Sequence, residues 1–387
     1  MEKMIDLARS LNPTELHIAY DLIEGRHQKT PIIRYGVVHS DGFRVQLYAK
    51  MDTLNPGGSF KDRGSLYAID KAIMEGRLTP GDTVVAASAG NHAKGVAKAA
   101  GDYALNAIIF MSDETPKTKI RGTEDLGATV QLVEGRYEKA AEEARGFAEE
   151  DDSMYIPAFE HSDIITGQST VVTEALIQLF RQGIRPDFFI YPVGGGGLAN
   201  GSGFAARYYD QTGLYRVNGF GSKIFNYGVQ ARNFNTMVRS FREGHVVQHE
   251  DRGETIADGI CVADASEAML LLSKGNIDDM FDVTEEEIRA AIRHVYDSPL
   301  IRQLQKKSHR ELELQFGFHA NHVPGVPRLN IVEGAAAAAF ACAFAEDKIP
   351  YEDIARSIHP RKEIIGVVIA SGNNIDQGIL EEILDES

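Results

Sequence analysis

The sequence repeats one pattern four times: a strand-like apolar run, a glycine-containing turn, and then a segment that can continue as a helix. The runs occupy 44–51, 83–88, 187–193 and 364–370, and the turns occupy 55–58, 89–92, 194–197 and 371–374. In an open parallel sheet such turns collect at the carboxyl ends of the strands, where ligands bind. We therefore expect an α/β fold with a ligand site where these turns meet.

One lysine stands where a helix is expected to begin. Arg44–Met51 predicts a strand, 55–58 its turn, and Ser59 the N-cap of the next helix, with Asp62 completing a capping box. Lys61 then lies in the first helical turn, where the helix dipole and partial burial both disfavour an ammonium. A neutral amine near pH 7 is what Schiff-base chemistry requires. Taken alone, such a residue is more often a solvated surface lysine, and the rest of the chain is what favours the reactive one.

Two of the glycine turns can bind anions through backbone N–H groups, without a charged side chain. The turn 194–197 is four consecutive glycines before a helix candidate at 198–209, and 89–92 precedes one at 93–100. Consecutive glycines have little use in a packed core because each loses much backbone entropy on folding. Two anion sites and one reactive lysine predict a ligand with two anionic groups and a carbonyl.

Together these segments resemble the pyridoxal-phosphate (PLP) enzymes of the tryptophan-synthase-β fold, fold type II, and among them the threonine/serine ammonia-lyase (dehydratase) and serine racemase branch. The resemblance runs from about residue 30 to the end of the chain. It implies an α/β fold with two open, twisted parallel-sheet domains and the active site in the cleft between them. Eight motifs occur in the family's order: GSFKDRG (58–64), SAGNHAKGVA (88–97), the segment 115–128, ITGQST (165–170), PVGGGGLANG (192–201), TIADGI (255–260), VEGAAAAA (332–339) and ASGNN (370–374).

The resemblance implies a role for each residue at these motif positions. Lys61 would be the Schiff-base lysine and the catalytic base, and Asn91 would hydrogen-bond the hydroxyl of the cofactor ring. The other cofactor-binding positions are Phe60, Gly194, Gly195, Gly196, Gly197, Leu198, Gly259, Glu333 and Ser371. The substrate would be bound by Ser88, Ala89, Asn91, His92 and Asp258. No metal ligand is assigned.

Ser371 carries a mechanistic expectation. A hydroxyl opposite the pyridine nitrogen cannot hold a proton on it as a carboxylate would, so the ring is a weaker electron sink. Rapid loss of a β leaving group is then favoured over transamination or decarboxylation. The expected activity is an ammonia-lyase that eliminates water from threonine, serine or a hydroxyaspartate-like amino acid to give a 2-keto acid and ammonia.

Four alternatives remain. The first three are a β-replacement synthase of the cysteine or threonine synthase kind, an amino-acid racemase, and a catalytically silent amino-acid-binding module. The fourth interprets Gly194-x-Gly196-x-x-Ala199 as a dinucleotide fingerprint, which requires an acidic residue about 20 positions on. The strand candidate at 216–220 ends in Gly221 and Ser222 instead, which argues against nicotinamide binding.

Composition fits a metabolic enzyme. The chain has 387 residues and a formal charge of −16, which disfavours nucleic acid and acidic membranes as partners. No apolar stretch reaches 18 residues, so no membrane span is expected. Cys261 and Cys342 form no CxxC motif. A cytoplasmic homodimer or higher homo-oligomer is expected.

The expected large domain comprises 1–81 and 161–387, with a small mobile domain at 82–160 and no C-terminal regulatory domain. In the small domain, strands are expected at 84–87, 107–111 and 129–133, and helices at 93–100, 117–126 and 137–149. The stretch 300–328 looks longer than in the family and is interpreted as an oligomer contact or pocket lid. His319 and His322 within it are interpreted as loop histidines and not as metal ligands.

Overall fold

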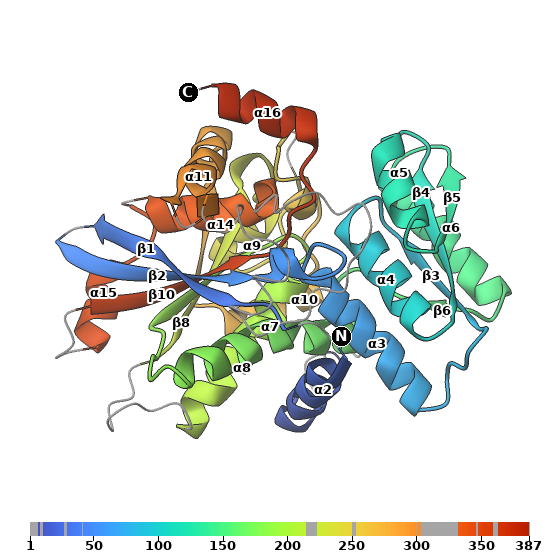
Figure 1. Ribbon diagram of the computed structural model, residues 1–387, viewed down its shortest axis with the longest axis horizontal. Helices are drawn as coiled ribbons and strands as arrows, with labels where there is room; N and C mark the ends of the chain where they lie inside the picture. Colours follow the sequence, from blue (N-terminus) through green and yellow to red (C-terminus); the bar gives the residue numbers. More distant parts are fainter. Residues whose placement is uncertain are drawn as a thin grey trace.

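Two separate sheets organise the chain (Figure 1). The computed structural model describes residues 7, 11–26, 29–40, 42–213, 223–249, 253–299, 301–302, 332–345, 347–358 and 363–386. The expectations for 216–222 and for nearly all of 300–328, including the two histidines, lie outside these residues.

The large sheet has six strands in the order β1-β2-β10-β7-β8-β9. They are β1 Ile32–Ser40, β2 Phe43–Met51, β10 Glu363–Ala370, β7 Phe188–Pro192, β8 Phe225–Ala231 and β9 Asp279–Val283. All neighbours pair in parallel except β1 and β2, which form an antiparallel pair at the edge. The parallel strands expected from the sequence are confirmed, and the antiparallel edge strand is an addition.

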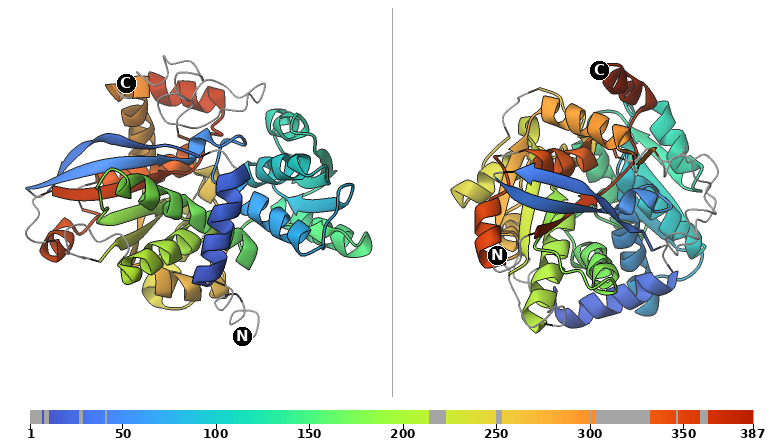
Figure 2. Two further views of the ribbon diagram at one scale, coloured as in Figure 1. Left: turned by 60° about the horizontal axis from the view of Figure 1, so that its bottom comes forward. Right: turned by 60° about the vertical axis from the view of Figure 1, so that its left-hand side comes forward.

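The small sheet has four parallel strands in the order β5-β4-β3-β6. They are β5 Thr129–Val133, β4 Asn106–Ser112, β3 Thr83–Ala87 and β6 Met154–Tyr155. Their helices α4 Asn91–Asp102, α5 Lys117–Glu124 and α6 Tyr137–Glu150 match the expected positions closely. Both views in Figure 2 place this sheet and its helices to one side of the large sheet.

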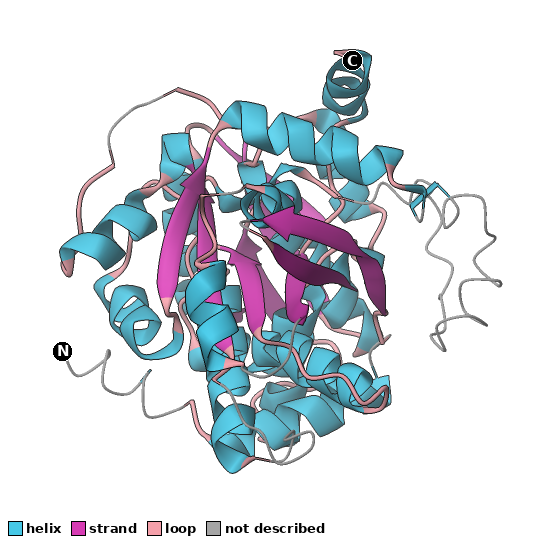
Figure 3. Ribbon diagram, turned by 90° about the vertical axis from the view of Figure 1, so that its left-hand side faces the viewer, coloured by secondary structure: helices cyan, strands magenta, loops and turns pink. Residues whose placement is uncertain are grey.

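Helices cover both faces of the large sheet (Figure 3). The remaining helices are α2 Pro13–Arg26, α3 Lys61–Met74, α7 Ser162–Phe180, α8 Gly197–Thr212, α9 Thr236–Glu243, α10 Glu267–Asn276, α11 Glu285–Asp297, α14 Gly334–Phe344, α15 Tyr351–Ser357 and α16 Gln377–Asp385, with short 3-10 turns η1 Asp52–Leu54, η2 Arg232–Phe234 and η3 Asp258–Ile260. No helix in these described ranges has both the length and the apolar character to cross a membrane.

Strand β7 shows why its sequence is continuously apolar. Phe188 and Ile190 pack into the core that contains the alanines of α14, whereas Phe189 and Tyr191 pack into the core with α7 and α8. Successive side chains of a strand point to opposite faces, so a strand covered on both sides needs apolar residues at every position.

The central position of β10 brings three glycine turns together. It lies between β2 and β7, so the turns after these strands share one sheet edge. There the Phe60 N–H donates to the Ser371 carbonyl (2.9 Å), and the Asn373 N–H donates to the Gly58 carbonyl (3.0 Å). Ser59 and Gly372 also form an isolated bridge.

The predicted capping box at α3 is wrong. The N-cap of α3 is Phe60, which makes no side-chain cap. Ser59 Oγ accepts weakly from the Lys61 N–H (3.3 Å), and Asp62 turns back to accept from the Gly57 N–H (2.6 Å). The tight glycine turn offers Asp62 a closer donor than the N-cap backbone, which sequence spacing alone could not show.

Candidate active site

Lys61 begins α3, and its ε-amine lies in an enclosed position. Its Nζ donates to the backbone carbonyl of Ala158 at 2.6 Å and lies 5.3 Å from the centroid of the Phe60 ring. Burial lowers the pKa of Lys61 to about 8, against a smaller opposing effect of the Glu333 charge. An amine with this pKa is partly neutral near pH 7, so it can act as a nucleophile and as a base.

The four glycines form the turn from β7 into α8. Gly196 is the N-cap of α8 and has a left-handed φ of 87°, a conformation that glycine adopts without strain. A Cβ on Gly195 would lie 2.4 Å from atoms of the Phe159 ring. The first N–H groups of a helix have no acceptor within it, so this side-chain-free turn suits a phosphate.

Asn91, Glu333 and Asn374 form a hydrogen-bonded group between the two sheets. Asn91 Nδ2 donates to Glu333 Oε1 (2.8 Å), and the Asn374 N–H donates to Glu333 Oε2 (3.0 Å). The Asn374 side chain in turn donates to Asn91 Oδ1. Burial, and then the Asp258 charge, raise the pKa of Glu333 to about 7.

The start of α4 carries the residues expected to receive a carboxylate. Helix α4 begins at Asn91 with Gly90 as a side-chain-free N-cap, and Ser88 Oγ accepts from the Gly90 N–H (3.2 Å). His92 is buried, with Nε2 2.9 Å from the Ile156 carbonyl oxygen, so Nε2 carries the proton. Burial, and then the Lys61 charge, lower the pKa of His92 to about 3. His92 is therefore neutral, and an anion here would depend on backbone N–H groups.

The turn η3 lies between the glycine loop and Glu333. A Cβ on Gly194 would lie 3.4 Å from the Gly259 carbonyl oxygen, and a Cβ on Gly259 would lie 3.2 Å from Glu333 Oε1. The carboxylate of Asp258, the residue before Gly259, forms an ion pair with Lys119 of α5 (2.7 Å). The contact joins a helix of the small sheet to the loop beside the glycine turn.

The residues fit the group that the motifs imply. Ser371 is buried at the end of β10, and Phe60 and Leu198 belong to one apolar cluster. In addition, both polar side-chain atoms of buried Gln168 lack a hydrogen-bond partner among the described residues. Gln168 Oε1 lies 3.0 Å from the position of a Cβ on Gly197. The site thus combines a partly neutral amine, a glycine cradle and unused hydrogen-bonding capacity.

Sequence reasoning assigned no role to Ala158, Phe159, Asn374, Lys94 or Lys119. Asn374 lies in the motif 370–374 and Lys94 in the motif 88–97, and Lys94 Nζ donates to Asn374 Oδ1 at 2.5 Å. Their place in recognised motifs could therefore have indicated that both residues belong to the site. Ala158 contributes only its backbone carbonyl, for which no side-chain signal exists.

The fold and this constellation define the class: a fold type II PLP enzyme, with a lysine at the start of one helix and a glycine-rich turn at the start of another. The family model described as "Pyridoxal-phosphate dependent enzyme" matches residues 23–301. The chain belongs to this PLP-dependent family.

Three individual proteins of known sequence or structure are similar to this chain. An L-threonine dehydratase of Lactococcus lactis is 32% identical over 74% of this chain and 66% of its own length, so the chain spans less than two thirds of that relative. The L-threo-3-hydroxyaspartate ammonia-lyase of Saccharomyces cerevisiae is 33% identical over 67% of this chain and 74% of its own. The processed threonine deaminase isoform 2 of Solanum lycopersicum superposes with a TM-score of 0.71 at 28% identity, covering 98% of this chain and 93% of that one.

Proposed function

We propose that this protein is a PLP-dependent ammonia-lyase for a β-hydroxy-α-amino acid, with threonine, serine and a hydroxyaspartate-like compound as candidate substrates. The substrate would lose its hydroxyl as water, and hydrolysis of the released enamine would then give a 2-keto acid and ammonia. The observation that carries the proposal is geometric: Lys61 Nζ donates to the carbonyl of Ala158, and the next residue, Phe159, lies against the glycine turn, 2.4 Å from the position of a Cβ on Gly195. Relatives named for threonine and for hydroxyaspartate support it.

When bound, PLP supplies an electron sink that acidifies the substrate α-carbon. Lys61 would hold the aldehyde carbon and, once displaced by the substrate amine, would remove the α-proton with its free Nζ. The Gly194–Leu198 turn would hold the phosphate, Phe60 would pack on the ring, and Ser371 would face the pyridine nitrogen.

On the substrate side, the start of α4 would bind the carboxylate through the segment 88–92. Asn91 would hydrogen-bond the ring hydroxyl, with Glu333 accepting its other amide hydrogen bond. Asp258 and Gly259 would lie beside the ring. Residues 82–160 would act as a mobile domain that closes over the substrate and excludes water, with 1–81 and 161–387 as the large domain. We place the enzyme in the cytoplasm as a homodimer or higher homo-oligomer.

The test is a panel of β-hydroxy amino acids incubated with purified enzyme, measuring keto acid, ammonia and the chirality of unreacted substrate. Stoichiometric keto acid and ammonia from at least one member is the expected result. In parallel, we expect a visible absorbance band from the C=N bond between cofactor and lysine. Borohydride reduction should remove this band and leave the cofactor covalently attached to Lys61 as a label. A panel with no product, or a label on another lysine, would contradict the proposal.

A further inference from the structure

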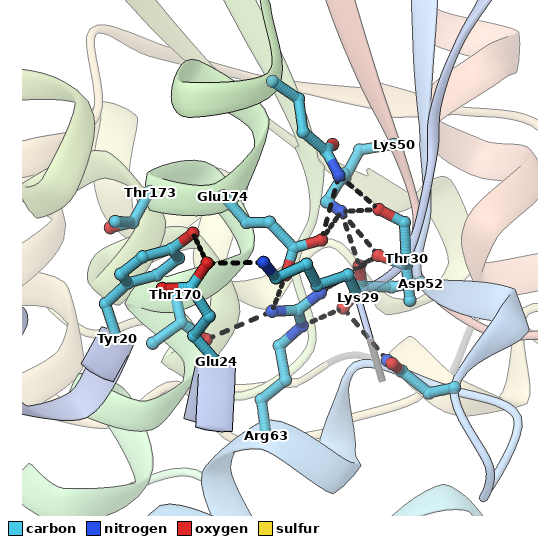
Figure 4. A network of polar contacts seen from close by, with 12 residues as sticks. Tyr20, Glu24, Lys29, Thr30, Lys50, Asp52, Arg63, Thr170, Thr173 and Glu174 are labelled. Atoms are coloured by element: carbon cyan, nitrogen blue, oxygen red, sulfur yellow. Dashed lines mark hydrogen bonds and ion pairs between the residues drawn. The ribbon is translucent and has the colours of Figure 1, made fainter. Parts of the chain in front are cut away.

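Four charged side chains with almost no solvent exposure form one network that includes Arg63, two residues after Lys61 (Figure 4). Lys50 comes from β2, Asp52 from η1, Arg63 from α3 and Glu174 from α7. None of them belongs to the site described above.

Arg63 is the centre of the network. Its Nε and Nη2 donate to the two carboxylate oxygens of Asp52 at 2.7 and 3.1 Å, and its Nη1 donates to Glu174 Oε2 at 3.0 Å. Lys50 Nζ completes the group by donating to Glu174 Oε1 (2.6 Å) and to both the carbonyl and Oγ1 of Thr30 (2.5 Å each). The planar guanidinium binds Asp52 through two N–H groups in a fixed geometry while a third reaches Glu174, and the single ammonium group of a lysine does not reproduce this geometry.

The four groups carry balanced charge. Burial raises the pKa of Asp52 and of Glu174, but the positive charges of Arg63 and Lys50 outweigh it and leave both pKa values lowered. Burial lowers the pKa of Lys50 despite the nearby Glu174 charge, whereas at Arg63 the Asp52 and Glu174 charges outweigh burial and raise the pKa. Arg63 is therefore the firmly charged cation of the network. Buried ion networks are often no more stabilising than apolar residues of the same volume, so stability alone does not account for this arrangement.

The network reaches Lys61 along the backbone of its own loop. Asn55 Nδ2 donates to Asp52 Oδ2 (3.1 Å) and to the Ser59 carbonyl (2.9 Å), and Ser59 Oγ accepts from the Lys61 N–H (3.3 Å). Arg63 is two residues beyond Lys61 in the same helical turn. One side of the network therefore fixes the loop and helix start that carry the amine.

The other side of the network reaches the helix that follows the acceptor of the amine. Glu174 lies on α7, and the segment just before α7 contains Ala158, whose carbonyl accepts from Lys61 Nζ. Helix α7 packs directly on α3 at Gly167, where a Cβ would lie 2.7 Å from the Arg63 carbonyl oxygen. The Arg63–Glu174 ion pair ties these two helices together.

We propose that Arg63 is a positioning residue: with Asp52, Glu174 and Lys50 it holds the first turn of α3 against α7, so that the Lys61 amine is aligned for attack on the cofactor aldehyde. This inference rests on the role proposed for Lys61. The step it serves joins Nζ to the aldehyde carbon as a C=N bond and releases one water.

The experiment separates alignment of the amine from binding of the cofactor. Two probes are added to cofactor-free full-length enzyme: PLP, which can react with the amine, and pyridoxine 5′-phosphate, which has the same ring and phosphate but no aldehyde. Arg63→Lys keeps one positive charge but loses the planar guanidinium that donates two hydrogen bonds to Asp52. The matched control is Arg44→Lys, which alters an exposed arginine of β2 paired with Glu363.

For Arg63→Lys we expect C=N formation and kcat to fall about tenfold or more, with pyridoxine 5′-phosphate affinity and KM changed by no more than about twofold, because misaligned groups lose rate without losing binding. Arg44→Lys should match the unmodified enzyme. Equal weakening with both probes, or no change with either, would overturn the inference.

A second variant covers the case in which Arg63→Lys fails to fold. The double change Lys50→Met with Glu174→Met removes one charge of each sign and leaves the Arg63–Asp52 pair intact. The double variant should also form the C=N bond more slowly than the unmodified enzyme, with the same affinity for pyridoxine 5′-phosphate. An unchanged rate of C=N formation would overturn the inference. Borohydride trapping in the unmodified enzyme keeps the two questions apart, since a label on a lysine other than Lys61 overturns the proposed function whatever the Arg63 variant does.

Discussion

Asn91 and Glu333 are 242 residues apart in sequence, and the Asn91 side chain donates to Glu333 Oε1 at 2.8 Å. Asn91 is the first residue of α4 beside the small sheet, and Glu333 is the N-cap of α14 against the large sheet. The hydrogen bond therefore ties the two sheets together at the candidate active site, next to the residues expected to bind cofactor and substrate.

Replacing Lys61 by alanine should abolish turnover without unfolding the protein. The amine is both the proposed attachment point and the proposed base, so we expect keto-acid formation to fall by about 10³-fold or more. Keto-acid assays with thermal unfolding as a control measure this. Near-native activity with PLP bound would exclude Lys61 as the nucleophile.

Replacing Gly195 by aspartate should sharply weaken cofactor retention. Its Cβ would lie 2.4 Å from Phe159 ring atoms, and a negative charge would enter a turn proposed to bind a dianion. Spectroscopic titration with PLP should show an affinity loss of at least about tenfold, the effect of roughly 1.4 kcal/mol. Gly146→Asp, in α6 with nothing within 4 Å of its Cβ, should leave affinity unchanged. Equal affinity in both variants would place the phosphate elsewhere.

Glu333 predicts a pH dependence of stability. Its pKa is raised from 4.5 to about 7, so the folded protein binds its proton more tightly than the unfolded chain does. This stabilising contribution is present below about pH 4.5 and is lost as the pH rises through about 7. Glu333→Gln should flatten the decline measured by denaturant unfolding between these values. Asp62 titrates in the same direction, with its pKa also raised to about 7 by burial. Buried His92 acts in the opposite direction, because its lowered pKa of about 3 makes stability rise with pH up to about 6.5. The prediction therefore concerns the difference in slope between the two proteins. An unchanged slope would show that the Glu333 carboxyl does not titrate there.

The enzyme should eliminate water with negligible racemisation. Racemisation requires an acid on the face opposite Lys61, because a proton removed from one face must be returned to the other. The resemblance to the serine racemase branch implies that this acid is the second serine of a Ser-Ser-Gly-Asn-His loop, and this chain has Ala89 at that position, which has no proton to donate. Chiral chromatography should find no D-amino acid, and Ala89→Ser should gain some racemisation. D-isomer accumulating as fast as keto acid would refute this prediction.

The sequence predicted the fold well because the pattern of strand, glycine turn and helix has a local cause. Continuously apolar runs such as Phe188–Pro192 are buried on both faces, and the sheet geometry then places their turns at one edge. The edge strand β1 was missed although its signal is local: Asp41-Gly42 between two strand-like runs is typical of a two-residue hairpin, and Ser40 pairs with Phe43 across it.

The sequence could indicate site positions only where a side chain or a glycine carries the chemistry, as at Lys61 and Gly195, and their roles stay predictions. A site position was not predictable where the contact is made by backbone or by distant partners. The spacing of Ser59 and Asp62 suggested a capping box, but Asp62 bonds to Gly57 instead. The network of Arg63 joins residues from four elements, and no local pattern indicates that they meet.

The acceptor of the Lys61 amine is the carbonyl of Ala158, and every residue type provides a carbonyl at that position. A point substitution at 158 therefore cannot delete this contact, although it can change the packing around it. What can move the carbonyl is the path of the chain between β6 and α7, including its length. We expect homologous enzymes with altered amine chemistry to differ here by insertions and deletions more than by single replacements, and loop-length variants of this segment offer engineers a way to tune the lysine without touching it.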